Sequence, residues 1–215
     1  STWDTSRSTP SRSFIGPISV IHRAHHHTLW NRNPRYTAAQ LDALVEAHPD
    51  NVEVRLVRGD LRRRMRQLDA AAADYQAAAE LAPNNPRSHV GLALIRIAQR
   101  DTAAAAGHVA RLRELVPDLP VVRYLEAMRA FQDGELDRAA EALQVLLRTA
   151  PGNLQAQLLY GIVSYGREEF TIADDYLTRV LANGLGNRQV SKLLGAARLK
   201  LRQPERAVEV LAPLV

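Results

Sequence analysis

A period of 34 residues runs through the chain and constrains its fold more than any other feature. Prolines that follow short aliphatic runs recur at this spacing, at Pro49, Pro83, Pro117 and Pro151. Two columns of small residues and one of large residues keep the same register: Gly59, Ala93, Ala127, Gly161 and Gly195; Ala71, Ala105, Ala139, Ala173 and Ala207; and Tyr75, Val109, Leu143, Leu177 and Leu211. Such columns indicate stacked units that bury their apolar faces against one another.

The composition indicates that the repeated unit is helical. Hydrophobic residues make up 46% of the chain but aromatic residues only 5%, so Ala, Leu and Val have to build the core. Ala and Leu are strong helix formers, whereas strands favour β-branched and aromatic residues. A proline cannot continue a helix, and Asn or Asp beside it can cap the next one. We therefore predict an all-α protein with two helices per period, the first over 52–65, 86–99, 120–132, 153–166 and 188–201, the second over 69–81, 102–115, 135–149, 169–182 and 204–214.

The period, the small residues and the proline resemble the tetratricopeptide repeat from Val52 to Val215. The resemblance implies a right-handed α-solenoid of antiparallel helix pairs, with units at 52–85, 86–119, 120–153, 154–187 and 188–215. Leu185 departs from the pattern, because proline is expected there, and the usual aromatic residue early in each unit is absent. Gly134 and Gly166 are expected to mark turns, and Thr102 and Asp133 to cap helices.

The N-terminal segment does not follow the repeat closely. Residues 1–17 are predicted to form a disordered tail, polar and rich in Ser, Thr and Arg at its start. Residues 18–51 are predicted to be a degenerate repeat whose second helix lies within 36–48. His22 and His26 could share a helix face, but Arg23 stands where a zinc protease motif needs glutamate. We therefore expect no metal and no cofactor.

The resemblance implies that the first helix of each unit lines a concave groove. Its middle positions are apolar and aromatic and its ends are charged, which suits a peptide or helix held by apolar anchors. The predicted groove residues are Leu56, Arg63, Val90, Leu94, Ile97, Tyr124, Met128, Phe131, Leu158, Ile162, Tyr165 and Lys192. Alternatively, some of these side chains belong to the core and another helix covers the rest.

Several function classes lack the residues that they need. The chain has no Gly-rich phosphate loop, no nucleophile elbow and no cysteine, so we expect no enzyme. Leu56, Asp60 and Gly91 stand where chaperone-binding repeats carry the lysine and asparagines that grip a carboxylate. The basic run Arg62–Arg66 lies at a helix C-terminus, where cations complement the dipole, in a unit with six basic and six acidic residues from 50 to 85. A nucleic-acid partner is therefore not expected, and no apolar run is long enough for a transmembrane helix.

These features predict a non-enzymatic scaffold for protein–protein interaction. The last 23 residues, LLGAARLKLRQPERAVEVLAPLV (193–215), resemble the tetratricopeptide lipoproteins of bacterial PEP-CTERM/exosortase and exopolysaccharide systems. That resemblance implies assembly of an envelope complex, in the bacterial cytoplasm or in the periplasm and cell envelope. The alternatives are a nucleic-acid-binding helical repeat and a regulatory region of a larger enzyme. Further repeats are expected downstream, because the ending would leave Leu211, Leu214 and Val215 uncovered.

Overall fold

The structure, a computed structural model, describes residues 36–185 and 188–214 of the chain. Helices follow one another through this part, and it contains no β-strand, as the all-α prediction requires. The helices are α2 (Ala38–Ala47), α3 (Val52–Arg64), α4 (Leu68–Leu81), α5 (Pro86–Ala98), α6 (Thr102–Leu115), α7 (Pro120–Gln132), α8 (Leu136–Thr149), α9 (Leu154–Gly166), α10 (Phe170–Ala182), α11 (Arg188–Lys200), α12 (Pro204–Leu211) and the 3₁₀ turn η1 (Ala212–Leu214).

The observed helices match the sequence prediction closely. Nine of the ten predicted helices in the repeats agree with the observed bounds to within one residue. The tenth, predicted over 204–214, is α-helical only to Leu211 and ends in a 3₁₀ turn. The helix expected within 36–48 is α2, whereas residues 1–35, with the predicted tail and His22 and His26, lie outside the described residues.

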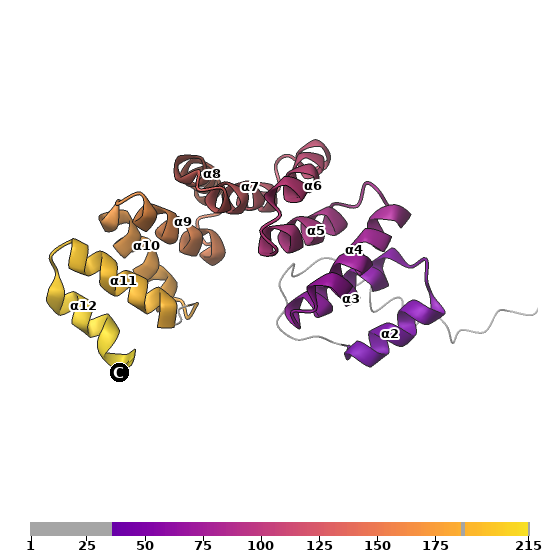
Figure 1. The fold of residues 1–215 in the computed structure, drawn as a ribbon, viewed down its shortest axis with the longest axis horizontal. Coiled ribbons are helices and arrows are strands. Elements are labelled where there is room, and N and C mark those ends of the chain that lie inside the picture. The colour runs from indigo at the N-terminus through magenta and orange to yellow at the C-terminus, as the bar shows by residue number, and fades with distance from the viewer. Residues whose placement is uncertain (1–35, 186–187, 215) are drawn as a thin grey trace, which may run out of the picture.

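Consecutive helices form antiparallel pairs that stack into a solenoid. Each pair packs internally, as α3 does with α4 and α7 with α8, and the second helix of a pair then contacts the first of the next. First helices also contact each other, α3 with α5, α5 with α7 and α7 with α9. Figure 1 shows the resulting arch, with α5, α7 and α9 toward its inner side and α6, α8 and α10 outside. The fold therefore gives the first helices one continuous inner surface.

The paired helices meet where a large side chain fills the space left by a glycine. The Tyr75 ring lies between α3 and α5, and a Cβ atom built at Gly59 or Gly91 would lie 2.9 or 2.6 Å from its atoms. Gly161 and Gly195 stand in the same way against Leu177 and Leu211. Ten small residues at these crossings are all buried: Gly59, Ala71, Ala93, Ala105, Ala127, Ala139, Gly161, Ala173, Gly195 and Ala207.

The turn inside each pair repeats with the same backbone conformation. Its central residue is left-handed in all five pairs, with φ between 58° and 79°, at Arg66, Arg100, Gly134, Glu168 and Arg202. The next residue donates its N–H to a carbonyl five positions earlier, as Glu135 does to Ala130 at 2.8 Å. This 6→1 bond belongs to the Schellman motif, which satisfies carbonyls at the helix end. Gly134 is thus a turn residue as predicted.

Three predicted helix-end residues are corrected by the structure. Gly166 is the last residue of α9, and the left-handed turn residue after it is Glu168. Thr102 begins α6, and Asp101 before it caps that helix by accepting a hydrogen bond from Ala104 N–H. Asp133 does not cap α8, because it ends α7 and pairs with Arg129. In each case the predicted residue lies at a helix end, but the left-handed or capping role falls to a neighbouring residue.

The turns before α3, α5 and α9 follow the prediction, whereas Leu119 before α7 makes no side-chain cap. The Asn51 side chain accepts a hydrogen bond from Val54 N–H at 3.1 Å, and Asn153 accepts one from Ala156 N–H at 3.0 Å. Such side chains satisfy backbone donors that the first helical turn leaves unpaired. Where Leu185 replaces the expected proline, α10 ends in Asn183 and a left-handed Gly184, φ 74°. Glycine therefore ends that helix in place of proline.

An ion-pair network joins α2 to the first complete pair. Arg58 and Arg62 of α3 both contact Asp42 of α2 and Asp74 of α4, with N–O distances of 2.6–3.0 Å. Asp74 is only 2% exposed, so its charge depends on these partners. Part of the arginine run near the end of α3 is therefore structural.

Replacing Gly134 by alanine tests the left-handed turn. A Cβ atom there meets nothing within 4 Å, so strain in the backbone is the only cost in the folded state. We expect Gly134→Ala to lower the free energy of unfolding by about 1 kcal/mol, measured by urea denaturation. Gly152→Ala is the control, because Gly152 also has free space and no left-handed φ. Equal effects of the two variants would contradict the prediction.

The space between α3 and α5 can be tested with two other glycines. Gly91→Ala would place a methyl group 2.6 Å from Tyr75, which is 1% exposed and cannot move aside. We expect a loss of about 1–3 kcal/mol in the free energy of unfolding. Gly107 in α6 has nothing within 4 Å, so Gly107→Ala should instead gain up to about 1 kcal/mol from helix propensity. A gain in both variants would show that the Tyr75 contact does not limit the packing.

Candidate peptide-binding groove

The first helices, three of which lie toward the inner side of the arch, carry the apolar and aromatic side chains that the sequence predicts for a groove. Tyr124, Met128 and Phe131 lie on one face of α7, because residues three and four apart share a helix face. Leu158, Ile162 and Tyr165 repeat this arrangement on α9, and Val90 and Leu94 lie on α5. These eight side chains are half-buried, and we call them the groove row: Val90, Leu94, Tyr124, Met128, Phe131, Leu158, Ile162 and Tyr165.

Most of the groove row also supports the core. Met128 packs against the core clusters of both its own pair and the preceding pair. Tyr165 packs against the cluster of α10 and α11, and its ring meets Phe170 edge to face at 5.5 Å. Burial raises the pKa of Tyr124. Within the described residues, Ile162 alone in this row packs against none of the core clusters. The row is therefore held rigidly, with one side chain less committed to packing.

Two predicted groove residues do not reach the surface. Leu56 is 0% exposed and Ile97 is 1% exposed. Leu56 packs in a cluster with Leu92 and Ile95, because the Tyr75 crossing brings α3 close to α5. Ile97 packs against the cluster that includes Leu125 of the next pair. Both side chains belong to the core, as the alternative interpretation of the sequence allowed, and they are removed from the groove.

Charged residues were predicted at the two ends of the groove. Arg63 of α3 is half-buried and Lys192 of α11 is exposed. Near Arg63, Arg87 bridges neighbouring first helices, with 2.6 Å to Glu53 and 3.2 Å to Asp60.

The Arg87 bridge is tied to the core through Tyr75. The Tyr75 hydroxyl donates to Asp60 at 2.7 Å, and burial, then Asp60, raises the pKa of Tyr75. The sequence analysis did not find this network. The signal was present, because Glu53 and Arg87 have opposite charges one period of 34 residues apart. The N-terminal end of the predicted groove thus carries charges, and Arg87, Glu53 and Asp60 already bind one another.

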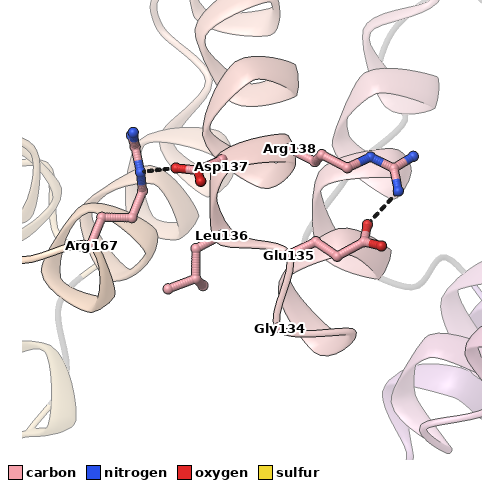
Figure 2. Close-up of a pocket in the computed structure, with 6 residues that line it drawn as sticks. All are labelled: Gly134, Glu135, Leu136, Asp137, Arg138 and Arg167. Carbon is pink, nitrogen blue, oxygen red and sulfur yellow. Dashed lines mark hydrogen bonds and ion pairs between the residues drawn. The ribbon is translucent and has the colours of Figure 1, made fainter.

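A shallow pocket lies at the turn between α7 and α8. Figure 2 shows its lining, with Arg167 of the next unit reaching Asp137 and with Arg138 paired to Glu135 on the other side. The Arg167–Asp137 distance is 2.9 Å, and the volume is about 580 Å³. Because the charged groups that line it are already paired, the pocket offers a ligand little unsatisfied polar chemistry. We interpret it as part of the junction between two units.

The C-terminal pair exposes apolar side chains. Leu199 is 54% exposed and Val208 is 63% exposed. They border an apolar pocket of about 480 Å³. Leu211, which the sequence analysis expected to be uncovered, is half-buried against Gly195. The side chains of Leu214 and Val215 lie outside the described part.

Two histidines face one another across the α5–α6 pair. Their Nδ1 atoms are 3.4 Å apart, and the His89 Nε2 atom is 3.0 Å from the Pro83 carbonyl oxygen. Burial, then His89 and Arg96, lowers the pKa of His108. The sequence analysis missed this contact, because the two residues are 19 positions apart and lie at no shared repeat position. In residues 36–185 and 188–214 there is no group of three or more side chains that could hold a metal ion, and no helix long and apolar enough to span a membrane.

The His108 environment predicts a pH dependence of stability. Because its pKa is lower in the folded protein, the unfolded chain binds the proton more readily as the pH falls. The stability that the neutral pair contributes is thus complete above about pH 6.5 and is lost as the pH falls below it. Thermal unfolding from pH 7 to 5 should show a smaller loss of Tm for His108→Gln than for the wild type. The control His48→Gln should show the same dependence of Tm on pH as the wild type. If His108→Gln also loses as much Tm as the wild type between pH 7 and 5, the prediction is wrong.

Comparison with solved structures supports the same fold. A chain of the APC/C hetero-tetramer Cut9–Hcn1 is 17% identical with a TM-score of 0.71, covering 80% of this chain and 34% of that one. A tetratricopeptide repeat protein from Parabacteroides merdae ATCC 43184 is 14% identical with a TM-score of 0.68, covering 93% and 73%. YrrB, a TPR protein with an unusual peptide-binding site, is 15% identical with a TM-score of 0.56, covering 82% and 91%. The chain thus spans about a third of the Cut9–Hcn1 chain.

Comparison with protein families identifies the repeat itself. The sequence pattern described as tetratricopeptide repeat matches residues 31–86, 56–120 and 124–171, which together make up more than half of the chain. No curated protein matches the chain. The matched residues carry the 34-residue period, the glycine crossings and the stacked helix pairs described above. The chain belongs to the tetratricopeptide repeat family, whose helical arrays are scaffolds for protein interaction.

Proposed function

We propose that the chain binds a segment of a partner protein, an extended peptide or an amphipathic helix, along the inner side of its arch. One observation carries this proposal: the eight side chains of the groove row are apolar or aromatic and half-buried, and they lie on α5, α7 and α9, first helices that contact one another in order. Such a row matches the spaced apolar anchors of a peptide segment. The charged residues Arg63 and Lys192 then lie at the two ends of the bound segment.

The packing of the groove row favours binding. Tyr165 and Met128 are held by neighbouring helices before any partner arrives. Little side-chain entropy is therefore lost on association, which improves affinity for a given contact area. Aromatic residues and Met are also enriched in protein interfaces. YrrB, whose fold is similar, has a peptide-binding site, and this supports the assignment of the same class of ligand here.

The charge distribution favours a protein partner over a nucleic acid. Residues 1–35 contain five of the 28 basic residues and one of the 23 acidic residues, so residues 36–215 contain 23 and 22. The repeat array is thus nearly neutral and lacks the basic excess that binds phosphate backbones. The resemblance of residues 193–215 to lipoproteins of exosortase systems makes assembly of a bacterial envelope complex the proposed setting.

The groove can be tested with peptides selected from a random library against the full chain. Ile162→Asp should weaken the affinity of a selected peptide at least about tenfold, a loss of about 1.4 kcal/mol, because it places a charge in the middle of the groove row. Ile162 is the suitable position since it packs against no core cluster in the described residues. Fluorescence polarisation measures the affinity, and circular dichroism checks the fold.

Leu81→Asp is the matched control. Leu81 is 42% exposed at the end of α4, the second helix of its unit, and does not belong to the groove row. We expect this variant to bind the peptide within about twofold of the wild type, because a partner on the inner side does not touch it. If Ile162→Asp keeps full affinity while its fold is intact, the bound segment does not lie in the groove, and the proposal is wrong.

A further inference from the structure

We propose that His89 and His108 form a binding site for a divalent transition-metal ion that joins α5 to α6. Their Nδ1 atoms lie 3.4 Å apart. Two imidazole nitrogens that bind one tetrahedral ion at about 2.0–2.1 Å are themselves about 3.3–3.4 Å apart. The nitrogens of this hydrogen-bonded pair thus have the spacing of a shared ion, and the rings, whose centroids are 5.6 Å apart, have to turn only slightly to direct both lone pairs at it. Imidazole ligands select Zn²⁺, Cu²⁺ or Ni²⁺ over Mg²⁺ and Ca²⁺.

The Pro83 carbonyl fixes the protonation of His89. A carbonyl oxygen only accepts hydrogen bonds, so the His89 Nε2 atom, 3.0 Å away, has to carry the hydrogen. In the neutral ring, the Nδ1 lone pair is then directed toward His108. Histidine ligands of metals commonly donate their other N–H to a backbone carbonyl in this way, which orients the ring. His89 therefore has the outer partner that a metal ligand needs.

The surroundings of His108 keep its ring neutral, and metals bind neutral imidazole. Burial is the largest cause that lowers the pKa of His108, and the positive charge of the adjacent His89 and of Arg96 lowers it further. Arg96, the charged group that acts on His108, also hydrogen-bonds through its side chain to Gln99. On binding, His108 moves its proton from Nδ1 to Nε2, so no proton is released above its pKa.

Two protein ligands imply an exchangeable ion with water in its remaining positions. Among the described residues no third ligand completes a group, so the site differs from a structural zinc site with four protein ligands. An ion here would link the two helices of the second unit, which carries Val90 and Leu94 of the groove row. Metal would therefore stabilise one unit of the array, independently of whether the groove binds a peptide.

The test has to separate this pair from the histidines at the N-terminus. A full-length background variant with His22, His25, His26 and His27 all replaced by Gln removes those competing ligands. Adding ZnCl₂ to this background should raise Tm, and EDTA should reverse the rise. His89→Gln and His108→Gln in the same background should abolish the rise. His48→Gln should keep it, since His48 lies apart from the pair at the end of α2.

Calorimetry and NMR complete the experiment. The background protein should bind one Zn²⁺ per chain, and each pair variant should bind it at least about tenfold more weakly. In ¹⁵N spectra of the background protein, the Nδ1 resonances of His89 and His108 should both shift on Zn²⁺ addition. This measurement does not depend on how well the variants fold, because it uses a protein that retains both histidines. Absence of binding in the background protein, or binding retained by His89→Gln, would overturn the proposal.

Discussion

The close approach of paired helices at small residues is the constraint on which the rest of the structure depends. Gly59 and Gly91 leave space for the Tyr75 ring, and Gly161 and Gly195 leave it for Leu177 and Leu211. Without a Cβ atom the helix axes come close enough for one large side chain to fill the gap, which gives the dense packing of protein interiors. The same crossing sets the direction of each first helix and thus forms the inner surface. It also buries Leu56, so the packing between units decides which side chains of the first helices remain available to a partner.

The turns show how repetition overrides local preference. Four of the five left-handed turn residues are Arg or Glu, although left-handed backbone costs a side-chain-bearing residue roughly 1–2 kcal/mol. The 6→1 hydrogen bond at the end of each first helix is the same in all five pairs. Each turn therefore adopts the geometry that the stacked helices on both sides impose, and the glycine at position 134 is the one residue suited to it locally.

Contacts explain which features could be predicted from the sequence. The helix bounds followed from proline and Asn at fixed spacing, because these residues act through local backbone chemistry. The repeat position was the basis for predicting the groove residues, but it could not predict the burial of Leu56 and Ile97, which depends on the side chains that the neighbouring unit presents. The His89–His108 contact and the Arg87 bridge to Asp60 join residues 19 and 27 positions apart. Only the charge reversal from Glu53 to Arg87 across one period indicated such a bridge.

Stability and the proposed recognition depend on many of the same side chains. Met128 and Tyr165 pack against core clusters and also belong to the proposed groove, so a change at either position would alter packing as well as any contact with a partner. The charges at the N-terminal end are paired to each other through Arg87, Asp60 and Glu53, and breaking them would cost the protein stability. A partner therefore gains little from charge at that end. Recognition in the proposed groove has to rest on shape and on apolar contact with a surface that the fold already holds rigid.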